Sequence, residues 1–306
     1  MSIYLTIFEA AQAIRHNKKC RWIYDWLEDL GVRICVSRFF NYLDAKKTAK
    51  SPTSQMEESK RFFSHHQKEV QENVKLLADD ASKDVYTKMI QFRCTHKYSD
   101  LPYNSMRKQY FGNDFLKYRE GQEVFVDCGA YDGDSIRLFR KKMKKCHIEN
   151  YKIVAFEPDQ VNLKSLQHHF PDALTIDACV WNQNDTLLFI NDATGNSRIE
   201  SINAVGQITK EHPSAIKMKA QSIDETPECK DASFIKMDIE GSEYNALLGA
   251  KKTIIRNKPK LAICIYHSDE DMIRIIRLIR DFVPEYKFYV RQHSNSIAET
   301  VLYATL

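Results

Sequence analysis

The sequence predicts a doubly wound α/β fold over about its last two thirds, preceded by a helical N-terminal extension. Two observations support this prediction. From Glu123 onward, short apolar runs alternate with helix-length amphipathic or polar segments, as a parallel sheet covered on both faces requires. Before Gly112 the only glycine is Gly31, and apolar residues recur there at helical spacing. The chain therefore divides into a helical part and an α/β part.

The N-terminal part, residues 1–97, is expected to form a helical arm. Its apolar residues at helical spacing are Trp22, Trp26 and Leu30, followed by Phe62, Phe63, Val70, Val74 and Leu77. A polar stretch separates the two groups, and we expect a loosely ordered segment near Ser51 and Pro52. Trp22 and Trp26 are expected to pack against the rest of the protein rather than to line a ligand site.

In the α/β part, each element can be placed from its pattern. Strands are expected at 124–128, 152–156, 174–180, 234–237 and 261–266, and helices at 135–145, 160–170, 242–256 and 270–282. The last two strands, 287–293 and 299–304, flank a short polar segment and are typical of a hairpin. Such a hairpin would place one antiparallel strand in an otherwise parallel sheet.

Composition and charge exclude several classes of protein. The 306 residues are 43% hydrophobic and 28% charged, which is ordinary for a globular protein and excludes disorder over most of the chain. The net charge of +4 is too small for a protein that binds nucleic acid through a dense basic face. We expect no secretory signal and no membrane span, because no apolar run of sufficient length is present.

Eight cysteines are scattered along the chain, and no two of them form a C-x-x-C pair. A zinc cage or a redox dithiol usually needs such a local pair. We therefore expect reduced thiols and a cytoplasmic location.

Polar residues follow several of the predicted strands, where a doubly wound sheet binds its ligand. The segment 127–135, DCGAYDGDS, supplies Gly129 and Gly133 next to a helix N-terminus, so a ligand could approach the backbone closely. It matches neither the dinucleotide motif G-x-G-x-x-G nor the nucleotide-binding motif G-x-x-x-x-G-K-[ST]. Its acids Asp127, Asp132 and Asp134 would repel phosphates, whereas they suit a ligand with ammonium and sulfonium charges.

Glu157 ends the second strand, 24 positions after Gly133 (157 − 133). An acid at about 20 residues from such a loop commonly binds ribose hydroxyls. An adenosyl ribose fits NAD and S-adenosylmethionine alike, and the phosphate-repelling loop favours the latter. The alternative is structural, with Glu157 as a helix N-terminal acid and Asp127 as a turn former.

The motifs VFVDCGAYDGDS, IVAFEPD, FIKMDIEGSE, CIYHSDED and YKFYVRQH…ETVLYA together resemble the FkbM family of S-adenosylmethionine-dependent methyltransferases. The resemblance covers about residues 110–303 and implies a methyltransferase domain at 98–306. It also implies a Rossmann-like class I methyltransferase sheet of seven mostly parallel strands, whose last strand is antiparallel. The loop departs from the general D/E-x-G-x-G-x-G pattern, because here it is D-x-G-x-x-x-G.

By this resemblance, the loop holds the methionine part of the cofactor, and Glu157 binds the ribose hydroxyls. Pro158 and Asp159 would close over the ribose, and the adenine would lie near Asp177 and Ala178. The loop residues assigned to the cofactor are Asp127, Gly129, Ala130, Asp132, Gly133 and Asp134.

An alcohol that accepts a methyl group must lose its proton, so a base is needed near the methyl position. His267 at the end of the fifth strand is the first candidate, and Asp238 at the end of the fourth is the second. Lys236 and Glu240 flank Asp238, and side-chain alternation would point all three the same way if the strand continued that far. We therefore include Lys236 among the catalytic candidates.

The expected acceptor is a hydroxyl of a sugar or small metabolite, by family resemblance. Glu240 and Tyr110 are candidate substrate-binding residues, and Phe111 and the segment between Asn191 and Ala220 are further candidates for the acceptor wall. We expect no metal, although an Asp–Glu–His cluster is an alternative site for a divalent cation. Glu243 is expected to brace the loop rather than to touch a ligand.

Two other functions are compatible with the pattern. An NAD-linked oxidoreductase would use the same α/β fold and Glu157, but the missing G-x-G-x-x-G motif speaks against it. A non-catalytic assembly protein would act through its N-terminal helices. The sequence does not indicate an oligomeric state.

Overall fold

The computed structural model describes residues 52–97, 100–102, 108–118, 121–191, 197–201, 216–294 and 296–306. The chain forms two compact units, Met1–Gln55 and Met56–Leu306. Trp22, Trp26 and Leu30 lie outside the described residues. All the candidate site residues belong to the second unit.

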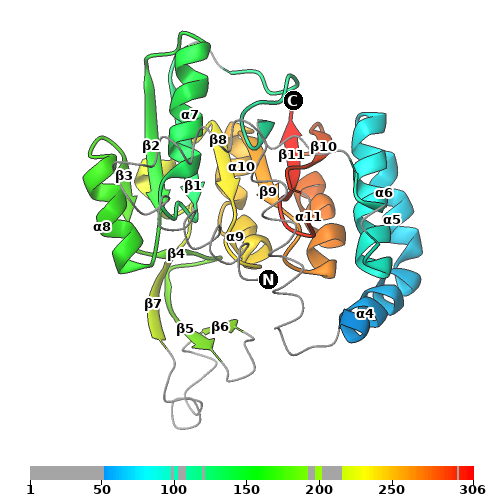
Figure 1. Ribbon diagram of the computed structural model, residues 1–306. Helices are drawn as coiled ribbons and strands as arrows, with labels where there is room; N and C mark the ends of the chain where they lie inside the picture. The colour runs from blue at the N-terminus through cyan, green and yellow to red at the C-terminus, as the bar shows by residue number, and fades with distance from the viewer. Residues whose placement is uncertain are drawn as a thin grey trace, which may run out of the picture. The chain divides into compact units, whose positions relative to one another are not determined.

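A seven-stranded sheet in the order β10-β11-β9-β8-β1-β2-β3 forms the centre of this unit (Figure 1). Its strands are β1 (Glu123–Cys128), β2 (Tyr151–Phe156), β3 (Leu174–Ile176), β8 (Phe234–Met237), β9 (Lys260–Cys264), β10 (Lys287–Gln292) and β11 (Thr300–Thr305). The pairs among β3, β2, β1, β8 and β9 are parallel. Strand β11 runs antiparallel to both β10 and β9. The predicted class I methyltransferase sheet, with its antiparallel last strand, is confirmed.

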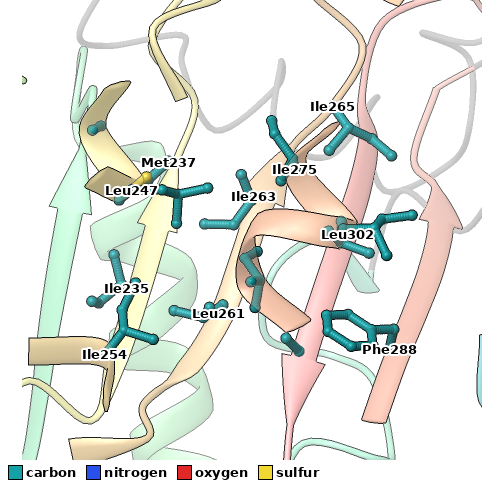
Figure 2. Close-up of a cluster of buried hydrophobic side chains, with 14 of the residues drawn as sticks. Ile235, Met237, Leu247, Ile254, Leu261, Ile263, Ile265, Ile275, Phe288 and Leu302 are labelled. Carbon is teal, nitrogen blue, oxygen red and sulfur yellow. The ribbon is translucent and has the colours of Figure 1, made fainter. Parts of the chain in front are cut away.

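One face of the sheet is covered by α9 (Glu243–Leu248), α10 (Lys251–Asn257) and α11 (Asp269–Phe282). Figure 2 shows Ile235 and Ile263 of the sheet packed with Leu247, Ile254 and Ile275 of these helices. Side chains on a strand alternate between the two faces, which is why Val126 lies in this core cluster and Phe125 in the other.

The opposite face is covered by α7 (Asp134–Lys145), α8 (Gln160–His169) and the segment 108–118. Phe111 packs edge-on against Phe125 and Phe139, at ring distances of 5.2 and 5.5 Å. Both faces of the central strands are therefore buried, as their continuous apolar runs predicted.

The helices α4 (Pro52–His65), α5 (Gln67–Leu76) and α6 (Asp80–Thr95) stand at the β10 side of the sheet (Figure 1). Buried Asn73 and Tyr86 donate hydrogen bonds to the carbonyl oxygens of Ile273 and Met272 on α11, at 3.0 and 2.9 Å. The described part of the expected arm is thus helical. The boundary between residues 97 and 98 stays a prediction. The expectation of a loosely ordered segment is wrong from Pro52 on, where α4 begins, since proline suits the first turn of a helix.

Two predicted elements are divided in the structure. The expected strand 174–180 is β3 and then β4 (Cys179–Val180), separated by a turn in which Ala178 N–H donates to Ile176. The expected helix 242–256 is α9 and α10, with Gly249 between them. A Cβ at Gly249 would lie 2.0 Å from the carbonyl oxygen of Trp181, so only glycine fits at this break.

A second sheet, in the order β4-β7-β5-β6, was not predicted. It contains β5 (Asp185–Asn191), β6 (Ser197–Ser201) and β7 (Ile216–Gln221) besides β4. It accounts for the described part of the segment between Asn191 and Ala220, and residues 192–196 and 202–215 lie outside the described residues. Among the helices that the structure describes, none is long and apolar enough to span a membrane.

Candidate functional site

The loop after β1 lies against the end of β8, backbone to backbone. Gly129 has a φ of +80°, and a Cβ there would lie 2.1 Å from the carbonyl oxygen of Asp238. The Asp238 N–H also donates to the Cys128 carbonyl at 3.2 Å. Glycine is therefore required at position 129, and the loop predicted to hold a cofactor is fixed directly to the strand end that carries Asp238.

Lys236 lies beneath this loop and is almost completely buried. Its Nζ is 3.2 Å from Asp127 Oδ1 and donates to the Gly129 carbonyl at 2.7 Å. Ser135 Oγ donates to the other oxygen of Asp127. Burial alone would lower the pKa of Lys236, but Asp127 and Asp238 raise it. Lys236 is therefore held protonated under the loop. A lysine that keeps its proton is not suited to act as the general base.

Gly133 precedes α7 with a φ of +82°, and a Cβ there would lie 2.2 Å from the ring of Phe170. Asp132 is paired with Arg137 at 2.9 Å, whereas Asp134 is exposed in the first turn of α7. Ala130 is buried, and its N–H donates to the Phe156 carbonyl at 3.1 Å. Of the three loop acids, Asp127 is completely buried, Asp132 is paired and Asp134 is exposed. Their assignment to a cofactor stays a prediction.

Glu157 joins the β1 loop to the end of β2. Its carboxylate accepts the Tyr131 N–H at 2.8 Å and the Asp159 N–H at 2.9 Å. These two bonds fix both carboxylate oxygens, and each oxygen keeps a further lone pair for a ligand. Glu157 does not cap the next helix, which was its alternative structural role, because Asp159 is the N-cap of α8.

Four residues assigned to the adenosine lie along the next stretch of the edge. Asp159 accepts the N–H groups of Val161 and Asn162 as the N-cap of α8, and Pro158 beside it is half-buried. Asp177 is exposed and accepts a hydrogen bond from Gln160 at 2.8 Å. Its neighbour Ala178 is buried. The described contacts give Asp159 a structural role as a cap, in addition to the predicted one.

Asp238 accepts hydrogen bonds from two tyrosines. The Tyr110 hydroxyl donates to Oδ2 and the Tyr266 hydroxyl to Oδ1, each at 3.0 Å. Burial alone would raise the pKa of Asp238, but Lys236, His267 and the two hydroxyls lower it. Asp238 is therefore a weak proton acceptor. Tyr110 itself is buried and meets the site through Asp238, and Phe111 packs in the core rather than in an acceptor wall.

His267 lies among three carboxylates. Nδ1 is 3.1 Å from Oε1 of Glu243, and Nε2 is 3.6 Å from Asp238 Oδ1 and 3.5 Å from Glu240 Oε2. The ring also lies 4.0 Å from the ring of Tyr266. Burial alone would lower the pKa of His267, but Glu243, Asp238 and Glu240 together raise it. The structure thus brings together His267, Asp238 and Glu240, which the sequence placed at two different strand ends.

Asp238, Glu243 and His267 could also hold a metal ion, since one ligand atom of each lies within 4.8 Å of the others. Imidazole and carboxylate together suit Mn²⁺ or Zn²⁺. However, Glu243 faces Nδ1 of His267 whereas Asp238 faces Nε2. One cation binds only one ring nitrogen, so the side chains as they lie suit proton transfer better than metal binding.

Strained backbone gathers at this edge of the sheet. Seven non-glycine residues of the described chain have a left-handed φ. Three of these, His96, His147 and Lys258, lie at or just after helix C-termini, where this conformation is common. The other four are Tyr110, Tyr131, Glu240 and Glu299. Such strain is often found at functional sites.

Sequence reasoning missed Glu299 and the hydrogen-bonding role of Tyr266. Glu299 precedes the antiparallel strand β11, so it lies at the same edge as the carboxyl end of β9. Gln109 donates a hydrogen bond to it, and burial and Asp238 raise the pKa of Glu299 to about 7. In the sequence, Glu299 is marked only by its place before the last strand. That place does not reveal at which edge of the sheet its side chain lies.

Comparison with known proteins shows the family of this chain. Residues 127–289, more than half of the chain, match the model of the methyltransferase FkbM domain. No protein with a curated description matches the sequence of this chain.

Among solved structures, the methyltransferase FkbM from Methylobacillus flagellatus KT is similar in fold, with a TM-score of 0.64 and 23% sequence identity. The match covers 80% of this chain and 60% of that one, so the chain spans less than two thirds of that protein's length. A pericyclic reaction enzyme and LepI in complex with SAM match with TM-scores of 0.33 and 9% identity, over 63% of this chain and 45% of each of theirs. These two similarities are too weak to support an inference.

Proposed function

Because the chain belongs to the FkbM methyltransferase family, we propose that it transfers a methyl group from S-adenosylmethionine to a hydroxyl of a sugar or small metabolite. The observation that carries the proposal is the meeting of three features at one sheet edge. These are the glycine loop after β1, the doubly anchored Glu157 carboxylate, and the His267–Asp238 pair.

The charge of this edge fits the cofactor. Asp238, Glu240, Glu243 and Glu299 gather there, while the nearby Lys236 is already paired with Asp127. A ligand with a sulfonium and an ammonium group is attracted by such a set of acids, whereas the diphosphate of NAD is repelled. In this proposal Asp127, Gly129, Ala130, Asp132, Gly133 and Asp134 surround the methionine part.

The adenosine end of the cofactor is assigned to the β2 and β3 ends. Glu157 accepts hydrogen bonds from the ribose hydroxyls, with Pro158 and Asp159 beside the ribose and Asp177 and Ala178 near the adenine. Because two backbone N–H groups already fix the Glu157 carboxylate, it is positioned before a ligand arrives.

Bound S-adenosylmethionine supplies an electrophilic methyl group. The protein has to align the acceptor hydroxyl with that group, exclude water and take up the hydroxyl proton. Of the two candidate bases, we assign His267, because the two tyrosine hydroxyls and Lys236 make Asp238 the weaker base. Asp238 then orients the acceptor together with Glu240, and Lys236 holds the loop in place.

The acceptor class and the location of the protein rest on indirect support. Acidic side chains accept hydrogen bonds from hydroxyl groups, so the edge suits a neutral polyol better than an anionic acceptor. All the cysteines that the structure describes are free thiols, which supports a reducing compartment such as the cytoplasm.

Calorimetric titration of the folded protein with S-adenosylhomocysteine and, separately, with NADH tests this function. We expect S-adenosylhomocysteine to bind at one site and NADH to give no saturable signal. Saturable binding of NADH alone would support the oxidoreductase alternative. Transfer of the labelled methyl group to a panel of neutral sugars would then identify the acceptor, and an O-methyl product is expected.

A further inference from the structure

We propose that Glu243 is the positioning residue of His267. Its carboxylate accepts a hydrogen bond from Nδ1–H. The unprotonated Nε2 then faces the substrate hydroxyl and takes up its proton. This inference rests on the proposed function, because it specifies how the assigned base is held. It gives Glu243 a role beyond bracing the loop.

The position of Glu243 fits this role. It is the first residue of α9, directly after the β8 loop, and its side chain is completely buried. Oε1 accepts the Ile239 N–H at 2.8 Å and lies 3.1 Å from Nδ1 of His267. The carboxylate is thereby fixed relative to both the β8 and the β9 strand ends. A buried carboxylate at this distance from one ring nitrogen selects the tautomer of the imidazole.

Several buried polar atoms of this pair lack a hydrogen-bond partner among the described residues. In the part of the chain that the structure describes, buried Oε2 of Glu243 has no hydrogen-bond partner, and neither ring nitrogen of His267 makes a hydrogen bond of good geometry. Buried polar atoms without a partner are costly and call for a functional explanation. Catalytic hydrogen bonds are often poorly aligned before the substrate binds and become aligned in the complex.

The opposite side of the imidazole ring, at Nε2, faces the residues that are proposed to orient the acceptor. Nε2 faces Asp238 and Glu240, and Glu240 is 91% exposed, so this side opens toward solvent and an incoming acceptor. The titratable groups that face His267 are therefore Glu243 at Nδ1 and Asp238 and Glu240 at Nε2, with Tyr266 packed on the ring. Only the Nδ1 side is closed by a completely buried acid.

The proton balance of the step is simple. The acceptor oxygen forms its bond to the methyl carbon while the carbon–sulfur bond breaks, and the O–H proton moves to Nε2. His267 becomes an imidazolium whose positive charge lies against Glu243. The Nε2 proton then leaves to water before the next cycle. A nucleophile, a base and an orienting carboxylate in this order recur in enzymes that activate hydroxyl groups.

Nuclear magnetic resonance of ¹⁵N-histidine-labelled protein tests this inference without a known acceptor. The pair of ring-nitrogen signals that is absent from the spectrum of His267→Gln belongs to His267. We expect His267 of the wild type to carry its proton on Nδ1 above its pKa. In Glu243→Gln, the pKa should fall and the Nε2–H tautomer should become populated. The matched control is Glu240→Gln, which removes an acid from the other side of the ring and should lower the pKa while Nδ1–H is kept.

Three results would overturn the proposal: an Nε2–H tautomer in the wild type, a Glu243→Gln spectrum with an unchanged tautomer, or saturable binding of Mn²⁺ or Zn²⁺ that shifts the His267 signals. If Glu243→Gln does not fold, the wild-type tautomer and the metal titrations still decide. Titration of the same samples with S-adenosylhomocysteine separates the outcomes, because failure to bind it would contradict the proposed function whatever the tautomer is.

Discussion

A methyl group on Gly129 would lie 2.1 Å from the carbonyl oxygen of Asp238. The backbone of the predicted cofactor loop therefore touches the end of β8, with no side chain between them. This strand end carries Asp238, which is proposed to orient the methyl acceptor. A shift of either segment moves the other. Under the proposed function, this contact couples the position of the cofactor to that of the acceptor, which matters for a reaction that requires in-line alignment.

The first prediction concerns this contact. Gly129→Ala should destabilise the fold by several kcal/mol, because it combines a left-handed φ with a steric clash against backbone. The matched control is Gly121→Ala, where φ is +113° but no described atom beyond its chain neighbours lies within 4 Å of the new Cβ. There only the conformational cost of about 1–2 kcal/mol should remain. Urea unfolding of both variants measures the difference, and equal losses would contradict the close approach.

The second prediction concerns the buried pair of Lys236 and Asp127. Lys236→Met leaves the Asp127 carboxylate buried without its cation, and we expect a loss of about 3–5 kcal/mol in the free energy of unfolding. The double variant Lys236→Met/Asp127→Asn should recover a large part of this loss. Additive effects in the urea unfolding of the single and double variants would show that the two side chains are not coupled.

The third prediction concerns Glu299 and pH. Burial and Asp238 raise the pKa of Glu299 to about 7 from the ordinary 4.5. Between these values the folded state keeps a proton that the unfolded chain has lost, so this group makes stability fall as pH rises. The stability of the wild type relative to Glu299→Gln should therefore fall by about 1–3 kcal/mol from pH 4.5 to pH 8. Urea unfolding at both pH values tests this, and Glu149→Gln, which replaces an exposed glutamate, is the matched control.

The fourth prediction concerns the ribose assignment. Glu157→Gln keeps the shape of the side chain and removes its charge, so the affinity for S-adenosylhomocysteine should fall about 10- to 100-fold, as expected for a hydrogen bond to a charged group. Isothermal titration calorimetry measures the change, and Glu149→Gln is again the control. Equal affinity of the wild type and Glu157→Gln would remove Glu157 from the cofactor site.

The fifth prediction concerns the N-terminal helices. Removal of residues 1–51 should leave cooperative unfolding intact, because Met56–Leu306 form one compact unit. Removal of residues 1–97 should abolish it, since Leu77, Tyr86 and Met89 belong to the core cluster of the sheet. Circular dichroism during thermal unfolding distinguishes the two. A cooperative transition in the shorter protein would show that the α/β part folds without α4–α6.

The central strands β1, β8 and β9 could be predicted because each is a mostly apolar run, and such runs occur where both sheet faces are buried. The division of one expected helix at Gly249 could not be predicted. The close packing of Gly249 against the backbone of Trp181, a residue far away in the sequence, leaves no trace in the local pattern. The small second sheet was missed because β6 and β7 mix polar and apolar residues, so neither reads as a continuous apolar run.

The residues of the site were easier to predict than their contacts. Strand-end positions identified Asp238 and His267. Side-chain alternation, however, did not predict where the side chains of Lys236, Asp238 and Glu240 lie. The strand β8 ends at Met237 and Glu240 is left-handed, so the extended geometry stops before Asp238. Lys236 consequently lies buried beneath the loop while Glu240 reaches His267 from solvent. Such contacts depend on backbone angles that a sequence pattern does not specify.

A crystal structure with bound S-adenosylhomocysteine tests the proposed cofactor site most directly. We expect the ribose hydroxyls on the Glu157 carboxylate, the methionine part along the loop from Asp127 to Gly133, and the sulfur facing the Asp238–His267 pair. S-adenosylhomocysteine bound elsewhere, or with its sulfur turned away from His267 and Asp238, would contradict the proposed function.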